Sequence, residues 1–358
     1  MPVIHVHSNL RDYDAVLDST LHFKDELSAL TNKVFVVDQN VWNLYGKSAL
    51  NWLDPQETIL FEVNEDKKNL TSVQEIVDRL LEKSAKRNLT LVTIGGGILQ
   101  DITGFVASTL YRGINWLFFP TTLLAQADSC IGSKTSLNYK GYKNLMGTFY
   151  PPSRVFIDVD YLATLKEADF YSGLGEAVKL SMMGGRQKVD RLVKIFPQVC
   201  SREKEYLQEI IRTSLEVKLD FISNDEFDLG RRNMLNFGHC FGHAIESVSN
   251  FAIPHGQAVV CGMILANFIA NRRGILSDDH LSYYEKELLV PSLKVRPGRS
   301  QMAVPDIIRA MEKDKKRTGS DLALVMMTDR DGELVRVNDL SREEVGQAVE
   351  YYLTQKVV

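Results

Sequence analysis

The sequence has few cysteines, and none of them belongs to a CxxC pair. Cys130, Cys200, Cys240 and Cys261 are scattered over 358 residues. This spacing excludes a disulfide-rich secreted scaffold and favours reduced thiols in a large core. Cys240 follows His239, but we interpret it as an inert, half-buried thiol because cysteine is commonly buried without a chemical role.

An excess of basic residues and long apolar runs are also missing. Lys and Arg number 42 against 46 Asp and Glu, for a net charge of −4. No broad basic surface for nucleic acid is therefore expected, although a local pocket for a small anion is. No apolar run approaches the roughly 20 residues that cross a bilayer, and the start, MPVIHVHSNLRDYD, lacks signal-peptide features. We expect a cytoplasmic protein with no membrane or nucleic-acid partner.

The two halves of the chain differ in pattern. With 44% hydrophobic residues, its length suits about two domains. Short β-rich runs alternate with helical patterns in the first half: VIHVHS, KVFVVDQN, ETILFEV, LTLVTIGGG, INWLFFPT and RVFIDV. From about Tyr161 onward, long helical stretches dominate, with a late hairpin in LALVMMTDRDGELVRV. We predict a parallel α/β domain over residues 1–160 and a mainly α-helical domain over residues 161–358.

A glycine loop interrupts the first half. In LTLVTIGGGILQDITGFVAS, an apolar strand runs into Gly95, Gly96 and Gly97 and then into an amphipathic helix. Glycines at this place let backbone N–H groups approach a phosphate, so a dinucleotide would fit; a simple packing turn is the alternative. The order differs from the common Rossmann fingerprint, because the plausible acidic residue, Asp38, lies upstream of the glycines.

A polar segment follows, PTTLLAQADSCIGSKTSLNYKGYKNLMG, which we read as loop-rich. It concentrates Thr121, Thr122, Asp128, Lys134, Asn138, Lys143 and Asn144. Lysine and amide donors suit a phosphorylated, hydroxyl-rich ligand, and a solvated loop is the alternative.

Three of the seven histidines lie between positions 239 and 255. On a helix, His239 and His243 would share one face, and His255 follows Pro254 in what we expect to be a loop. In SGLGEAVKLSMM, Glu176 and Lys179 also share a helix face. One carboxylate with two or three histidines is a ligand set for a catalytic zinc ion, but the spacing does not decide which histidines bind it.

Eight motifs, in order, resemble 3-dehydroquinate synthase and its sugar phosphate cyclase relatives. They are GGGILQDITGFVAS, YRG, PTTLLAQADSCIGSKTSLN, KNLMGTFYPP, GLGEAVK, NMLNFGHCFGHAIE, HGQAV and DKK. The resemblance implies a dinucleotide-binding α/β domain, a mostly helical metal-binding domain, and a homodimer. It also implies NAD, a divalent metal (zinc or cobalt) and a phosphorylated sugar-acid substrate.

The same resemblance assigns roles residue by residue. The metal ligands would be Glu176, His239 and His255. The implied NAD contacts are Asp38, Asn40, Glu65, Lys68, Gly96, Gly97, Asp101, Thr121, Thr122 and Lys143. The implied substrate contacts are Asp128, Lys179, Lys218 and Asn236 for hydroxyls, Lys134, Asn144 and His243 for phosphate, Arg232 and Lys315 (or Lys316) for a carboxylate, and Arg112 for the partner subunit's pocket.

The activity implied is that of 3-dehydroquinate synthase: oxidation of a carbinol by NAD, phosphate elimination, return of the hydride and carbocycle closure. GSKTSLN in place of the commoner GGKTGIN, and Gln257 in place of a frequent glutamate, leave open a cyclase of secondary metabolism, of the 2-epi-5-epi-valiolone or 2-deoxy-scyllo-inosose synthase type. Arg232 favours the first reading, because a substrate without a carboxylate has no use for it. A metal-dependent polyol dehydrogenase is the third alternative.

Overall fold

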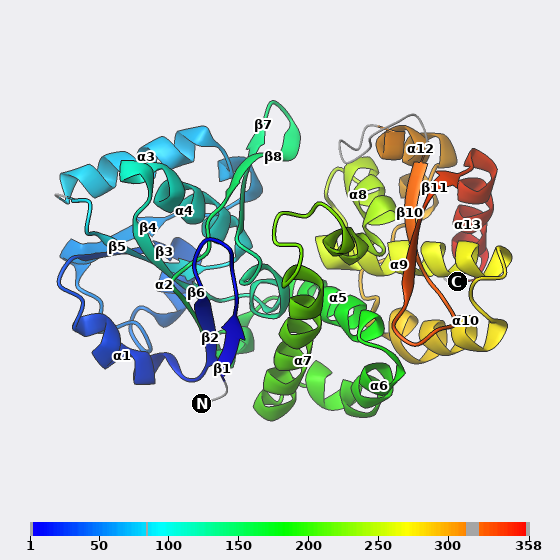
Figure 1. The fold of residues 1–358 in the computed structure, drawn as a ribbon, viewed down its shortest axis with the longest axis horizontal. Coiled ribbons are helices and arrows are strands. Elements are labelled where there is room, and N and C mark those ends of the chain that lie inside the picture. Colours follow the sequence, from blue (N-terminus) through cyan, green and yellow to red (C-terminus); the bar gives the residue numbers. More distant parts are fainter. Residues whose placement is uncertain (1–2, 84, 313–321, 356–358) are drawn as a thin grey trace. The chain divides into compact units, whose positions relative to one another are not determined.

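A computed structural model describes residues 3–83, 85–312 and 322–355. The chain forms two compact units (Figure 1). Unit 1 comprises the chain up to Leu165 together with Ile222–Phe227, and unit 2 comprises Lys166–Phe221 and the chain from Asp228 onward. None of the described helices is long and apolar enough to cross a membrane.

Unit 1 is built on a seven-stranded sheet in the order β1-β2-β9-β6-β5-β3-β4. Its strands are β1 (Val3–Val6), β2 (Tyr13–Leu17), β3 (Lys33–Asp38), β4 (Thr58–Phe61), β5 (Thr90–Gly95), β6 (Asn115–Pro120) and β9 (Arg154–Ile157). All pairs are parallel except β1 with β2. The predicted parallel α/β sheet and its six strands are confirmed. The sequence did not reveal β2, because Asp14 interrupts its short apolar pattern.

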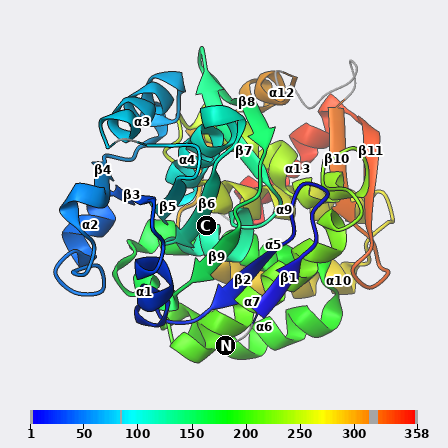
Figure 2. The ribbon, with the colours of Figure 1, turned by 60° about the vertical axis from the view of Figure 1, so that its left-hand side comes forward.

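Helices cover both faces of this sheet. They are α1 (Thr20–Ser28), α2 (Gln39–Tyr45), α3 (Leu70–Glu82) and α4 (Gly97–Thr109). Figure 2 shows α3 and α4 on one side and α1 and α2 on the other. One core contains Phe23 and Leu27 of α1 with Phe35, Ile94 and alternate residues of the neighbouring strands. Because strand side chains alternate between faces, these apolar runs fill a core on each side.

The segment read from sequence as a loop contains a β-hairpin instead. A π-helical turn, Ala125–Ser129, is followed by β7 (Lys134–Tyr139) and β8 (Tyr142–Phe149), which pair antiparallel. Lys140 and Gly141, which form the turn, have φ of 48° and 78°. Positive φ at both turn residues is the geometry that connects tight hairpins. The loop prediction was wrong because β7 and β8 mix polar and apolar residues, and no residue of β8 is buried, so the sequence shows no clear apolar alternation.

Unit 2 is mainly α-helical, as expected, and its described residues include one two-stranded sheet. Its elements are α5 (Glu167–Met183), α6 (Arg186–Cys200), α7 (Lys204–Ile222), α8 (His239–Val248), α9 (His255–Arg272), α10 (Asp278–Tyr284), α11 (Val290–Ser292), α12 (Val304–Glu312), β10 (Leu322–Met327), β11 (Leu334–Leu340) and α13 (Arg342–Gln355). Helix α9 lies against α5, α8, α13 and β10 (Figure 1). The hairpin β10–β11 is the one predicted from sequence.

Glycines let α9 approach α5 and α8 closely. A Cβ atom on Gly256 would lie 1.8 Å from the Ser172 carbonyl oxygen, and one on Gly175 would lie 2.3 Å from the Gly256 oxygen. On the other side, a Cβ on Gly262 would lie 1.9 Å from the Gly238 oxygen. These contacts are backbone to backbone, so no side-chain rotation relieves them. Glu176 and His255 are the immediate neighbours of Gly175 and Gly256, and the glycine crossing therefore sets how far apart they lie.

We predict that Gly256→Ala destabilises the protein by about 3 kcal/mol, the upper end of ordinary overpacking, because Ser172 and α9 must separate. Chemical denaturation of the wild type and the variant measures this. Gly298→Ala is the matched control, since nothing lies within 4 Å of its Cβ position. Equal stability of the two variants would contradict the close crossing.

Candidate functional site

Three helices of unit 2 bring Glu176, His239 and His255 together. Glu176 lies in the middle of α5 and is fully buried, while His239 and His255 are the first residues of α8 and α9. The Nε2 atoms of His239 and His255 lie 3.5 and 3.2 Å from Glu176 Oε1. The three ligand atoms lie within 4.8 Å of one another, as a metal site requires. His255 is helical, contrary to the expected loop, because α9 begins directly after Pro254, and proline readily precedes a helix.

The Glu176 carboxylate is suited to a cation. Lys179 Nζ lies 2.6 Å from its Oε2, yet neither carboxylate oxygen accepts a hydrogen bond of good geometry from a described residue. Burial opposes ionisation of Glu176, but the Lys179 ammonium and the adjacent His239 and His255 hold its pKa well below the ordinary value. A buried carboxylate with incompletely satisfied oxygens is what a divalent metal would complete, so the residues fit such an ion.

The two histidines differ in charge. Burial and the nearby Lys179 lower the pKa of His239 well below its ordinary value, so its imidazole is neutral, the form that binds metals. Burial also disfavours a charge on His255, but the adjacent carboxylates of Glu176 and Glu246 raise its pKa to about 10. A metal ion that binds His255 must therefore displace this proton.

Glu246 is a site residue that the sequence analysis missed. Its Oε2 lies 3.0 Å from His255 Nδ1, and the carboxylate is buried. A carboxylate on one ring nitrogen orients the other nitrogen toward the metal, here Nε2 toward Glu176. The signal was its position three residues after His243 in GHAIE, on the same helical face. His243, Glu246 and His255 also form a second cluster with metal-ligand spacing.

The other residues predicted for unit 2 lie as follows. One pocket of unit 2 is lined by Asn236, His239, Cys240 and His243. Residues 322–325 of β10 and Arg336 also line it. The His243 ring lies 5.3 Å from His239 and 5.9 Å from His255, between centroids. Lys218 on α7 and Arg232 on the turn Arg231–Asn236 are buried. Lys315 and Lys316 lie outside the described residues.

The residues predicted to bind NAD gather at one edge of the unit 1 sheet. Asp38 ends β3, Gly95 ends β5, and Thr121 follows β6, so all lie at the carboxyl ends of adjacent parallel strands. Asp38 begins α2 by accepting a hydrogen bond from Asn40 N, at 2.8 Å, and Gly96 begins α4. A Cβ on Gly96 would lie 3.0 Å from Thr122 Cγ2. Parallel sheets bind dinucleotides at this edge, where helix N-termini point at phosphates.

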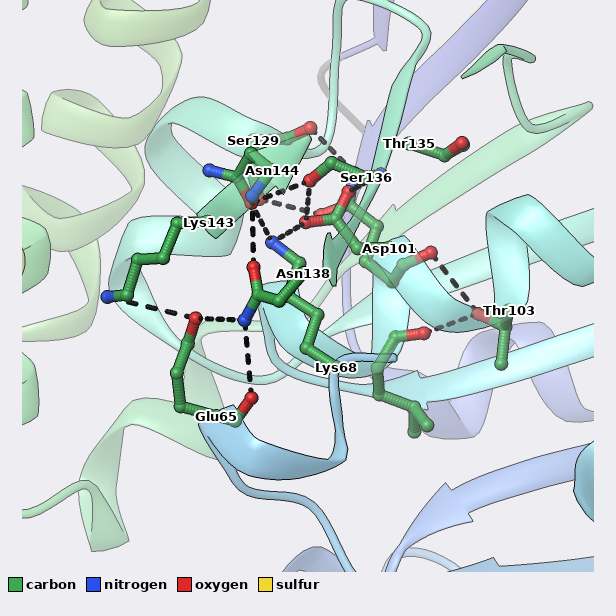
Figure 3. A network of polar contacts seen from close by, with 12 residues as sticks. Glu65, Lys68, Asp101, Thr103, Ser129, Thr135, Ser136, Asn138, Lys143 and Asn144 are labelled. Atoms are coloured by element: carbon green, nitrogen blue, oxygen red, sulfur yellow. Dashed lines mark hydrogen bonds and ion pairs between the residues drawn. The ribbon is translucent and has the colours of Figure 1, made fainter. Parts of the chain in front are cut away.

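A polar network extends this edge to the hairpin (Figure 3). Lys68 Nζ lies 2.5 Å from Asp101 Oδ2 and 2.6 Å from Asn144 Oδ1. Asn138 Nδ2 donates to Glu65 Oε1 at 2.8 Å, and Lys143 Nζ lies 3.7 Å from the same oxygen. The network thus joins residues that are predicted to bind NAD with Asn144, which is predicted to bind the substrate phosphate.

Asp128, Lys134 and Arg112, the remaining predicted residues, also belong to unit 1. Asp128 is half-buried in the π-helical turn, and Lys134 is exposed at the start of β7. Arg112 is exposed and has φ of 64°.

The departures from the family pattern have local structural explanations. Gln257 is fully buried; its Nε2 donates to the carbonyls of Tyr171 and Ser292, and its Oε1 accepts from Lys294 N and Val295 N. A glutamate would lack both donors. Ser133 has φ of 65°, in the left-handed region that glycine adopts without steric cost. Its hydroxyl donates a hydrogen bond to Glu226 Oε1 at 2.6 Å.

Comparison with known proteins identifies the family. Residues 58–172 match the N-terminal family model of 3-dehydroquinate synthase, and residues 173–317 match its C-terminal model. The chain belongs to the 3-dehydroquinate synthase family. A 3-dehydroquinate synthase from Clostridium tetani is 35% identical over 351 residues, covering 97% of this chain and 91% of the relative.

Solved structures of this family's cyclase relatives share the fold. The 2-epi-5-epi-valiolone synthase of Streptomyces hygroscopicus subsp. jinggangensis, with NAD+ and Zn2+ bound, has a TM-score of 0.86 at 25% identity and covers 98% of this chain and 99% of that one. A 2-deoxy-scyllo-inosose synthase with carbaglucose-6-phosphate, NAD+ and Co2+ has a TM-score of 0.79 at 20% identity, covering 99% and 100%.

We predict that Glu176→Gln, His239→Ala and His255→Ala abolish tight zinc binding, whereas His243→Ala retains it. Glu246→Gln should weaken zinc binding about 10- to 100-fold, the usual effect of losing a partner that orients a ligand. Metal analysis after dialysis, and competition with a chromophoric chelator, give both results.

These variants also distinguish the two clusters that share His255. Strong zinc loss in His243→Ala and Glu246→Gln, with binding intact in Glu176→Gln and His239→Ala, would assign the metal to His243, Glu246 and His255 instead.

Proposed function

We propose that this chain is a 3-dehydroquinate synthase that converts 3-deoxy-D-arabino-heptulosonate 7-phosphate to 3-dehydroquinate and phosphate. In this proposal it uses NAD and a divalent metal, zinc or cobalt. Similarity to 3-dehydroquinate synthases over nearly the whole chain supports the activity. The observation that carries the proposal is the buried Glu176 carboxylate beside His239, His255 and Lys179.

When bound, the metal would acidify a substrate hydroxyl, and NAD would take a hydride from the carbon that bears this hydroxyl and later return it. Glu176, His239 and His255 would hold the metal, with Glu246 orienting His255. Lys179, whose ammonium group lies against Glu176, would donate a hydrogen bond to a substrate oxygen. The edge residues Asp38, Gly96, Gly97, Thr121 and Thr122 would hold NAD, with Asn40, Glu65, Lys68, Asp101 and Lys143 beside them.

The remaining residues would recognise the substrate. Lys134, Asn144 and His243 supply donors for its phosphate, while Asp128, Lys218 and Asn236 face its hydroxyls. Arg232 and Lys315 would bind its carboxylate. In the elimination step the neighbouring ketone acidifies the departing proton and the substrate's own phosphate accepts it as base, so few protein acid–base groups are required.

We propose further that two copies of the chain form a homodimer in which Arg112 of each copy enters the pocket of the other. The exposure of Arg112 supports this, as does the lack of any ion pair from it to a described residue. We place the enzyme in the cytoplasm, because four cysteines that form no disulfide suit a reducing compartment.

We predict many phosphates released per enzyme molecule without accumulation of NADH, because the hydride returns to the same substrate. The assay presents the heptulosonate phosphate, sedoheptulose 7-phosphate and glucose 6-phosphate separately, and scores phosphate release, carbocycle formation and NADH absorbance. Removal of metal by a chelator should abolish turnover, and added zinc or cobalt should restore it. NADH formed in proportion to product would instead indicate a polyol dehydrogenase.

Arg232→Ala should reduce kcat/KM for the heptulosonate phosphate. The reduction should correspond to a loss of about 2 to 4 kcal/mol in transition-state stabilisation, the scale for losing one buried charged pair. Any turnover of sedoheptulose 7-phosphate, which lacks the carboxylate, should change little. Steady-state kinetics of both proteins on both sugars separates lost recognition from general damage. A wild type that prefers the carboxylate-free sugar would assign the chain to the cyclases of secondary metabolism.

A further inference from the structure

Ser136 belongs to β7 and joins the hairpin to the polar network at the carboxyl edge of the unit 1 sheet (Figure 3). Its backbone N–H donates to Asp101 Oδ1 at 2.9 Å. Its hydroxyl lies 3.0 Å from Asp101 Oδ2 and 2.9 Å from Asn144 Oδ1. Ser136 is also one of the two serines by which GSKTSLN departs from the family pattern. It therefore contacts one residue assigned to NAD and one assigned to phosphate.

The hydroxyl of Ser136 cannot serve both acceptors at once. It carries one proton, whereas the Lys68 ammonium carries three and can donate to Asp101 and Asn144 together. When Ser136 donates to Asp101, Asn144 Oδ1 accepts from Lys68 alone. Lys68 and Ser136 fill the two acceptor sites of Asp101 Oδ2, so another donor on this oxygen takes the place of Ser136 and makes its proton available to Asn144.

The donor that reaches Asn144 fixes the orientation of its amide group. Lys68 Nζ and Ser136 Oγ both lie against Oδ1, so the NH2 group of Asn144 must point away from them. No described residue accepts a hydrogen bond from this NH2 group. A second donor on Oδ1 restricts rotation of the amide group further and keeps the NH2 group oriented to donate to an anion.

We infer that Ser136 is a positioning residue that makes NAD and phosphate bind cooperatively. This rests on the proposed function, in which NAD contacts Asp101 and phosphate contacts Asn144. A hydroxyl group of NAD donates to Asp101 Oδ2, the Ser136 proton then turns to Asn144, and the fixed amide binds phosphate more tightly. By thermodynamic reciprocity, bound phosphate strengthens NAD binding by the same factor.

Calorimetric titration of the zinc-loaded protein with NAD tests this cooperativity. One titration is carried out in inorganic phosphate and the other in chloride at equal ionic strength. We expect phosphate to lower the Kd for NAD about fivefold in the wild type, the lower end of common coupling between two sites. In Ser136→Ala, which retains the backbone N–H bond to Asp101, the change should fall below about twofold. Ser136→Thr keeps a hydroxyl group and should restore the coupling.

Ser108→Ala is the matched control. It removes a serine hydroxyl from α4 of the same unit, but that hydroxyl contacts Phe105 O and Thr148 rather than the network. Its coupling should equal that of the wild type.

The outcomes separate this inference from the proposed function. A wild type that binds no NAD would overturn both. NAD binding that phosphate does not strengthen, or full coupling in Ser136→Ala, would overturn the cooperative role of Ser136 and leave the proposed function standing. Loss of coupling in Ser108→Ala as well would show that any disturbance of the unit removes it, and would overturn the specific role.

Discussion

A fully buried carboxylate is the constraint around which unit 2 is organised. Glu176 has no exposure on α5, and an isolated charge there would be very unfavourable. Lys179 comes from the same helix, while His239 and His255 are supplied by the first residues of α8 and α9. Both helices must therefore begin at the carboxylate, which places tight limits on where they start.

Glycine makes that arrangement possible. Because α9 contacts α5 at Gly175 and Gly256, and contacts α8 at Gly238 and Gly262, three helix backbones converge more closely than larger residues allow. Glu246 then reaches His255 from α8 and fixes the direction of its ring. The packing and the candidate metal chemistry therefore depend on the same few positions.

Unit 1 gathers its functional residues by a different principle. Parallel strands end at a common edge, so short loops after β3, β4, β5 and β6 lie near one another without any special packing. The hairpin β7–β8 then attaches to this edge through side-chain hydrogen bonds, with Asp101 and Lys68 at the centre. Departures from the family pattern, at Ser133, Ser136 and Gln257, all make hydrogen bonds in the structure. They are accounted for by local bonding and do not by themselves require a different substrate.

The sequence by itself determined six strands of the unit 1 sheet, the predominance of long helices in unit 2 and the kinds of chemistry available, because apolar periodicity and residue type are local properties. Its motifs also sufficed for the family. It did not reveal the hairpin, since β7 and β8 mix polar and apolar residues without clear alternation, nor the helical position of His255. Only the tertiary structure decided that Asp38 lies beside Gly95, because strand order is not encoded in strand spacing. Tertiary structure likewise assigned roles to Glu246 and Ser136, because a glutamate or a serine acquires a role only from the groups that packing brings against it.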